Sequence, residues 1–305
     1  MRKIWIILTL LSASIIMGWV AAPREARGGD AGANTETCKM CHQDRYAGYA
    51  KSIHANKALR RSPANERGCE SCHGPGTTHI QKGGGRGTGM IGFSKGKVDA
   101  AVKSAQCLAC HADFRNLAFW DMSKHQSSGI SCDSCHSIHS GQKKNLKSAQ
   151  PDLCLSCHRD VRGQIAKQSH HPLREGKVKC TDCHEPHGGF GTKMVKAGTA
   201  NELCYKCHAE KRGPFLWEHP PVEENCQTCH TVHGSNHLKL LTNRTPQLCE
   251  TCHDNTGHVG NLLTSFNTFQ GSAPSNRLYA RACLNCHSEI HGSTGPSSRG
   301  RFFVR

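Results

Sequence analysis

The sequence predicts a chain of short α-helices and coil, with little or no β-sheet, wrapped around a row of bound prosthetic groups. The 305-residue chain is only 36 % hydrophobic and 6 % aromatic, with a mean hydropathy of -0.56. That is little apolar material for a core of this size. The chain also contains 31 glycines, 20 cysteines and 22 histidines. A polypeptide of this composition needs something other than its own side chains to pack against, and its cysteines indicate what that is.

All 20 cysteines fall into ten Cys-x-x-Cys-His pentads, so none is left for a disulfide or a free nucleophile. This pentad is the attachment signature of a c-type haem, in which two thiols bond to the haem and the adjacent histidine ligates the iron. Zinc ribbons also use paired cysteines, but they do not need a histidine after every second one. A disulfide framework would not repeat one spacing ten times. The sequence therefore predicts ten covalently bound c-type haems.

The predicted attachment residues are Cys38, Cys41, Cys69, Cys72, Cys107, Cys110, Cys132, Cys135, Cys154, Cys157, Cys180, Cys183, Cys204, Cys207, Cys226, Cys229, Cys249, Cys252, Cys283 and Cys286. The predicted proximal iron ligands are His42, His73, His111, His136, His158, His184, His208, His230, His253 and His287.

Twelve further histidines remain for ten distal ligand positions, because ten of the 22 close the pentads. The surplus histidines are His170 and His237. We prefer His171 over His170 because His171-Pro172 matches His219-Pro220, although either histidine could reach an iron. The predicted distal ligands are His54, His79, His125, His139, His171, His187, His219, His233, His258 and His291.

These ligands recur in five copies of a two-haem unit, which cover residues 38–79, 107–139, 154–187, 204–233 and 249–291. The copies define one predicted decahaem domain over residues 29–305. We expect helices at Asp99–His111 and Asn201–Lys211, and a flexible loop at Gly83–Gly89. No alternating strand pattern stands out.

Three distal candidates, His139, His187 and His233, lie three residues after a proximal histidine. If the chain is helical there, both histidines project from the same helix face. The later histidine then cannot reach the opposite side of the same haem. We therefore expect it to ligate a neighbouring haem or none. Ligation of a neighbouring haem would hold the haems close together.

Residues 1–28 read as a secretory signal peptide. Arg2 and Lys3 precede an apolar run from Ile4 to Val20, and the small residues Ala21 and Ala22 follow. Cleavage is expected between Ala22 and Asp30, and the alternative is a retained membrane anchor, for which the run is slightly short. Export fits the predicted haems, since c-type attachment takes place after secretion.

The formal charge of +16 would fit a nucleic-acid partner. Ten haems would however add about twenty propionate charges, so we interpret the basic residues as propionate partners and solvated surface, with no nucleic acid bound. There are more histidines than iron positions, whereas a multihaem reductase needs one open position. Four methionines that could ligate iron are interpreted as packing residues: Met40, Met90, Met122 and Met194. The prediction is an electron-transfer protein with no catalytic residue.

The chain resembles the decahaem cytochromes of the MtrA and DmsE type. The likeness rests on the ten pentads and on two strings, Gly213–Pro221 (GPFLWEHPP) and Arg281–His287 (RACLNCH), the second followed by Ile290-His291-Gly292. It implies a periplasmic protein at the outer membrane that inserts into a β-barrel porin. The implied electron partners are an inner-membrane or periplasmic cytochrome and an extracellular cytochrome or terminal reductase. The alternatives are a soluble periplasmic electron shuttle and a multihaem reductase.

Overall fold

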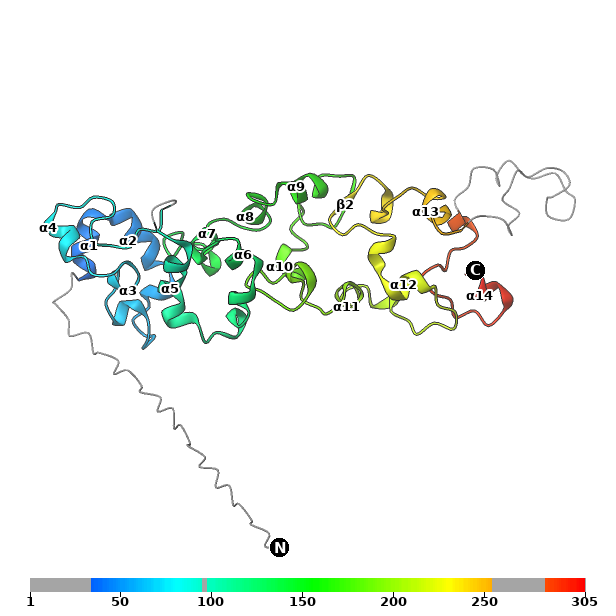
Figure 1. The fold of residues 1–305 in the computed structure, drawn as a ribbon, viewed down its shortest axis with the longest axis horizontal. Coiled ribbons are helices and arrows are strands. Elements are labelled where there is room, and N and C mark those ends of the chain that lie inside the picture. The colour runs from blue at the N-terminus through cyan, green and yellow to red at the C-terminus, as the bar shows by residue number, and fades with distance from the viewer. Residues whose placement is uncertain (1–33, 95–97, 254–282, 305) are drawn as a thin grey trace, which may run out of the picture.

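The computed structural model describes residues 34–94, 98–253 and 283–304, so the predicted signal peptide lies outside the described residues. The chain forms an elongated rod. Helices α1 to α4 lie at one end, and α13 and α14 lie at the other (Figure 1). Elements follow one another along the rod nearly in chain order, so position along the sequence corresponds to position along the long axis. No described helix is long and apolar enough to cross a membrane.

The α-helices are α1 Thr35–Cys41, α2 Gln43–Ala50, α3 Glu70–His73, α4 Thr77–Gln81, α5 Ala100–His111, α6 Lys124–Ser127, α7 Cys132–Cys135, α8 Asp152–Leu155, α9 Arg159–Ile165, α10 Cys180–Cys183, α11 Ala200–Tyr205, α12 Pro220–Glu224, α13 Gln247–Glu250 and α14 Ser298–Arg301. Single 3₁₀ turns are Ile53–Ala55, Pro63–Asn65, Arg115–Leu117, Trp120–Met122, Lys143–Asn145, Thr192–Met194, Ala209–Lys211, Cys226–Thr228, Leu238–Leu240 and Cys283–Asn285.

The longest described helix, α5, confirms the expected helix at Asp99–His111. The carboxylate of Asp99 accepts a hydrogen bond from the backbone N–H of Ala101 at 2.8 Å and so caps the helix. The expected helix at Asn201–Lys211 is wrong beyond Tyr205. The backbone of His208, at φ -103° and ψ 49°, leaves the helical region, and only a 3₁₀ turn follows it.

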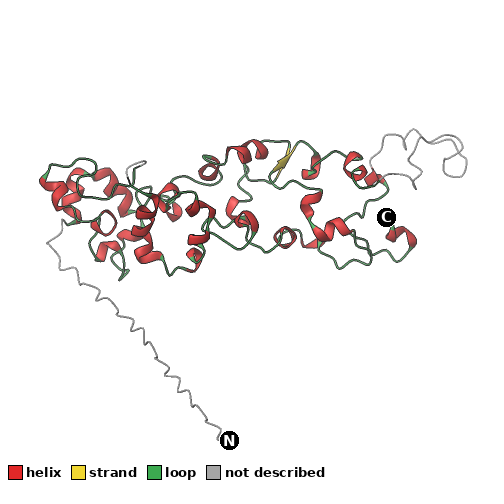
Figure 2. Ribbon diagram, viewed as in Figure 1, coloured by secondary structure: helices red, strands yellow, loops and turns green. Residues whose placement is uncertain are grey.

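Strand pairing is minimal, as predicted, and Figure 2 shows one small sheet. Strands β1 (Ser169–His170) and β2 (Gly234–Ser235) pair antiparallel. Three isolated bridges join a proximal histidine to a later residue: His136 to Leu146, His184 to Val195 and His230 to Leu241. The sequence pattern did not show these bridges, because each involves a single residue pair.

Five large apolar side chains are buried among the described residues, and three of them, Leu155, Ile165 and Leu173, form one small cluster. In place of a core, the pentads line a continuous cavity of about 4200 Å³. A pocket for a single small ligand is typically about 300–1,000 Å³. The rod is therefore built around a space for several large groups.

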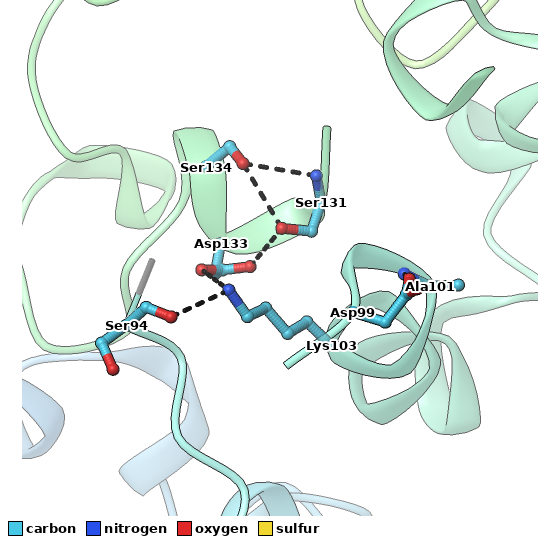
Figure 3. A network of polar contacts seen from close by, with 7 residues as sticks. All are labelled: Ser94, Asp99, Ala101, Lys103, Ser131, Asp133 and Ser134. Carbon is cyan, nitrogen blue, oxygen red and sulfur yellow. Dashed lines mark hydrogen bonds and ion pairs between the residues drawn. The ribbon is translucent and has the colours of Figure 1, made fainter. Parts of the chain in front are cut away.

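A buried polar network joins the third and fourth pentads (Figure 3). The ammonium of Lys103 on α5 donates to the carbonyl of Ser94 at 3.1 Å and lies 4.0 Å from a carboxylate oxygen of Asp133 on α7. The two charged side chains are only 8 % and 17 % exposed, so each charge needs the other. The same carboxylate accepts a hydrogen bond from the hydroxyl of Ser131. Because Cys107 lies on α5 and Cys132 begins α7, the network fixes two attachment segments against each other.

We expect the chain without haem to be unfolded. Fixing one residue costs roughly 1–2 kcal/mol of backbone entropy, whereas each buried apolar side chain returns about 1.5–3 kcal/mol, and few are buried here. Far-UV circular dichroism and protease resistance of the cytoplasmically expressed, haem-free chain will check this. A native-like helical signal with a cooperative melt would contradict it.

Candidate haem-binding sites

We number the sites 1 to 10 by the order of their pentads, with site 1 at His42 and site 10 at His287. Nine proximal histidines each face one predicted distal histidine across a gap. The ring centres are separated as follows: site 1 His42–His79 6.2 Å, site 2 His73–His139 6.3 Å, site 3 His111–His54 5.9 Å, site 4 His136–His187 6.1 Å, site 5 His158–His125 6.2 Å, site 6 His184–His233 6.2 Å, site 7 His208–His171 6.4 Å, site 8 His230–His291 6.1 Å and site 9 His253–His219 6.2 Å.

This separation matches two imidazoles that share one metal ion. A ring nitrogen bonds a transition metal at about 2.0 Å, and the ring centre lies ~1.1 Å behind it, so two opposed rings have centres about 6.2 Å apart. Direct stacking of aromatic rings covers the whole range from about 4.5 to 7 Å. Nine ring pairs within 5.9–6.4 Å are therefore spaced by something other than contact between the rings.

Backbone carbonyls orient the proximal rings of the even-numbered sites. In site 6, the Nδ1 of His184 lies 3.1 Å from the carbonyl of Lys193. A carbonyl can only accept, so Nδ1 carries the proton and Nε2 is left with the lone pair that binds a metal. The same arrangement occurs in the other even-numbered sites: His73 with Ile91 at 2.9 Å, His136 with Lys144 at 3.0 Å, His230 with Lys239 at 2.8 Å and His287 with Phe302 at 2.6 Å.

Three of these carbonyls come from one repeated loop, which we call the lysine loop and which covers residues 143–146, 192–195 and 238–241. Two consecutive residues of each loop have a left-handed backbone, for example Lys193 at φ 54° and Met194 at φ 56°. Each such residue costs roughly 1–2 kcal/mol. The chain is held there by backbone hydrogen bonds to the pentad, from Glu185 to Met194 at 2.7 Å and from Lys196 to Cys183 at 2.9 Å. Recurring strain of this kind marks a functional position.

Sequence reasoning did not find the lysine loop. Its signal is a lysine eight or nine residues after the proximal histidine in three successive repeats, at Lys144, Lys193 and Lys239. The side chain is not what the site uses, since the contact to the ring is made by the backbone carbonyl. A pattern of side-chain types therefore does not predict the lysine loop.

Most distal rings are oriented through Nδ1 as well. The acceptors are backbone carbonyls for three of them: Pro186 for His125 at 2.9 Å, Arg45 for His139 at 2.8 Å and Val232 for His171 at 2.6 Å. The Nδ1 of His79 lies 3.0 Å from the hydroxyl of Thr88, and the Nδ1 of His233 lies 3.2 Å from the side-chain oxygen of Gln164. Because Nδ1 makes these contacts, Nε2 is the ring nitrogen that faces the partner ring.

Burial favours the neutral form of seven of the paired rings. Loss of solvent lowers their pKa below the usual range for histidine, and a neighbouring histidine, in six cases the facing one, acts in the same direction. A neutral imidazole has the lone pair that a metal requires. The seven are His54, His111, His139, His187, His219, His233 and His291.

Eight of the nine ring pairs join different repeats, and only His42–His79 lies within one. The repeat over residues 204–233 is therefore not self-contained, because its rings face His171, His184, His253 and His291. His139, His187 and His233 each face a histidine of the preceding repeat. The helix considered for this part of the chain is not present. The backbone is extended at His136 and His184, with ψ near 148° and 146°, and the chain bridges to the lysine loop instead of continuing a helix.

The structure distinguishes the two adjacent histidine candidates. The ring of His171 faces His208, whereas the ring of His170 contacts the carboxylate of Glu175 at 3.2 Å and the carbonyl of Lys167 at 2.7 Å.

Two methionines also differ from expectation, since Met40 is 71 % and Met122 is 78 % exposed and neither packs in an interior. His258 lies outside the described residues, so site 10 shows its proximal histidine alone.

The cysteines show that each haem site lies beside the sites that precede and follow it in the sequence. Thiols of consecutive pentads interact at every step, by way of their first cysteines or their second cysteines in alternation. For example, a hydrogen bond to Cys107 lowers the pKa of Cys132 to about 6. In a haem-loaded protein these sulfurs are thioethers, so only their proximity carries over. The pairs are Cys38–Cys69, Cys72–Cys110, Cys107–Cys132, Cys135–Cys157, Cys154–Cys180, Cys183–Cys207, Cys204–Cys226, Cys229–Cys252 and Cys249–Cys283.

These residues fit covalent haem. Paired cysteines adjoin each proximal ring, the facing rings leave room for an iron, and residues of the second to tenth pentads line the cavity. Zinc ribbons would gather four ligands around one point. No three metal-ligating side chains converge in that way within residues 34–94, 98–253 and 283–304.

Sequence comparisons agree with this geometry. A family model for the doubled CXXCH motif matches residues 125–163, 170–213 and 219–258, and the model for cytochrome c554 and c-prime matches residues 90–137. The doubled-motif model pairs the second pentad of one repeat with the first of the next. It is thus offset by one pentad from the five-repeat division.

The chain is 39 % identical over 280 residues to the multihaem cytochrome MtrA of Shewanella baltica, which covers 90 % of this chain and 83 % of that protein. The chain belongs to the MtrA family of multihaem c-type cytochromes. It is also 27 % identical to the c-type polyhaem cytochrome OmcB of Geobacter sulfurreducens, over 72 % of this chain and 28 % of that protein. For the high-molecular-weight cytochrome c of Nitratidesulfovibrio vulgaris the identity is 23 %, over 82 % of this chain and 44 % of that protein. The family and the pentads make this an electron-transfer cytochrome with covalent c-type haems.

Adjacent histidines allow a matched test of the distal assignment. His171→Ala removes a ring that faces His208, so one haem is expected to lose its sixth ligand and give a high-spin ferric signal. His170→Ala removes contacts with Glu175 and Lys167 but none with another imidazole, and is expected to leave the spectrum unchanged. Electron paramagnetic resonance of the ferric proteins, with haem content checked in parallel, measures both. A high-spin signal from the His170 variant instead would reverse the assignment.

Proposed function

We propose that the protein binds ten c-type haems, one at each pentad, and that the nine ring pairs supply both axial ligands of nine irons. Bound haem supplies an iron that alternates between ferric and ferrous states and so accepts and releases one electron at a time. The observation that carries this proposal is the ring spacing of 5.9–6.4 Å, which recurs in all nine pairs.

The crossing pattern supports His258 as the distal ligand of site 10. In repeats one to four, the histidine between the two pentads faces the first proximal ring of the following repeat, as His219 faces His253. His258 is the corresponding histidine of the last repeat, which has no following repeat. At the other end His79 turns back to His42 within its own repeat. The distal histidine of site 10 would turn back in the same way.

We propose that the protein transfers electrons and catalyses no reaction of its own. Both axial positions of the nine paired sites are taken by imidazole rings, so none offers an open position to a substrate. The chain's residues orient these rings through Nδ1 and exclude a third ligand. Arg60, Arg61 and Arg67 line the cavity and are suited to pair with propionates.

The sites are in single file, which suits conduction from one end of the rod to the other. Cysteines of consecutive pentads interact at every step, so neighbouring haems would be held by neighbouring attachment points. The crossed histidines reinforce this, because one backbone segment binds two or more haems. Electrons would enter at one terminal site and leave at the other.

We propose that the protein works in the periplasm at the outer membrane, sheathed by a β-barrel porin. There it would pass electrons between an inner-membrane or periplasmic cytochrome and an extracellular cytochrome or terminal reductase. The elongated single-file arrangement supports this, as does the resemblance to MtrA (Figure 1). A polar rod needs such a sheath, since its backbone groups would be unsatisfied in lipid.

Purification of the tagged native protein from mild detergent extracts of outer membranes tests the porin. Recovery of a stoichiometric β-barrel supports the conduit. Recovery of the protein alone from the soluble periplasmic fraction would contradict it and leave a free electron shuttle.

His219→Met tests the ligand assignment by its effect on potential. A thioether ligand stabilises ferrous iron relative to imidazole, so we expect one haem to shift to a higher reduction potential while haem attachment stays complete. Potentiometric titration of the visible spectrum measures the shift. If every potential stays in place, His219 is not an axial ligand.

A further inference from the structure

The proximal rings fall into two classes that alternate along the rod. All five even-numbered sites have a backbone carbonyl on Nδ1, at 2.6–3.1 Å. Among the odd-numbered sites no described proximal ring has one. At site 7 the carboxylate of Glu210 lies 3.9 Å from the Nδ1 of His208, which is too far for a hydrogen bond.

The alternation follows from how the chain leaves each pentad. At sites 1, 3, 5 and 7 the chain soon enters another helix or 3₁₀ turn, as α1 passes through His42 into α2. At sites 4, 6 and 8 the chain extends after the proximal histidine and returns through the lysine loop, which places a carbonyl behind the ring. The difference is therefore a property of the backbone in each half of the repeat.

Distal partners offset this alternation at sites 1, 5 and 7, where Thr88, Pro186 and Val232 place an acceptor at the Nδ1 of the distal ring. They strengthen the difference between a few other sites. The Nδ1 of His139 in site 2 meets the carbonyl of Arg45 at 2.8 Å, and that of His233 in site 6 meets the side-chain oxygen of Gln164 at 3.2 Å. Sites 2 and 6 thus have an acceptor behind each ring. In site 3, by contrast, the Nδ1 of His54 is buried without a hydrogen-bond partner.

An acceptor on Nδ1 draws the ring proton away and makes the imidazole a stronger electron donor to iron. This stabilises the ferric state and lowers the reduction potential. We infer that the haems of sites 2 and 6, where both rings have an acceptor, are among the lowest in reduction potential, and that the haem of site 3 is among the highest. The inference rests on the proposed ligation of the irons by the ring pairs.

The consequence is a preferred order of filling. The haem of site 3 would be among the first to be reduced, and the haems of sites 2 and 6 among the last. An electron at site 3 would also disfavour a second one at the adjacent site 2, because like charges repel. Electrons would then rest at site 3 and pass through sites 2 and 6.

Gln164 provides the sharpest test, because its side chain rather than its backbone is the acceptor. Gln164→Leu removes the acceptor from site 6, and Gln164→Glu replaces it with an anionic one. Burial and propionates also act on potentials, so changing one acceptor isolates its effect. The matched control is Gln126→Leu, which lies beside His125 on α6, while His125 itself is oriented by the carbonyl of Pro186.

Potentiometric titration of each haem-loaded variant, together with electron paramagnetic resonance, gives the readout. We expect Gln164→Leu to raise the reduction potential of one haem. One tenth of the absorbance change should then leave the lower half of the wild-type range of potentials for a higher potential. Gln164→Glu should shift one tenth of the absorbance change to a lower potential. Gln126→Leu should match wild type. His54→Met, in site 3, should shift one tenth of the absorbance change from the upper half of the range of potentials to a still higher potential.

Two results would overturn the inference while leaving the ligand assignment intact. One is an unchanged titration of both Gln164 variants with all haems still low-spin. The other is that the haem that changes lies in the wrong half of the wild-type range of potentials: the upper half for Gln164→Leu, or the lower half for His54→Met. Failure of the ligand assignment itself has a different signature: His233→Ala would leave every haem low-spin.

Discussion

The structure depends on pairs of imidazole rings that face each other across a gap the width of one metal ion. The pairs link segments far apart in sequence, such as His73 with His139 and His230 with His291. Few buried apolar side chains are present to hold these segments together in the described part of the chain. Haem ligation would therefore supply much of the tertiary structure. In this respect the protein resembles small metal-dependent domains, in which binding free energy is folding free energy.

Crossed pairing of the rings explains why the repeats form a rod. In each interior repeat, the two later histidines face proximal rings of the neighbouring repeats, and its own proximal rings face histidines of those repeats. Such a unit cannot close on itself, so it must stack with others, as in other repeat proteins. The first repeat departs from this rule because His79 turns back to His42. A chain built this way has two distinct ends, which is what a conductor needs.

Much of this could be predicted from the sequence because haem attachment uses a fixed covalent pattern. The pentads predict the proximal ligands directly, and counting histidines in each repeat predicts a distal set. The pairing of the rings could not be predicted, because a histidine's position in the chain does not say which neighbouring ring it faces. For His139 the sequence left the partner open, and the helix considered there is absent from the structure. The lysine loop was also missed, since its function resides in a carbonyl and a left-handed backbone that many sequences can adopt.

The account is tested most directly by an iron-edge anomalous difference map of crystals of the haem-loaded protein. We predict ten iron peaks in single file, nine of them lying between the two rings of the pairs found here. Irons ligated by two histidines of the same repeat in the interior of the rod would contradict the account. So would a break in the file between consecutive sites.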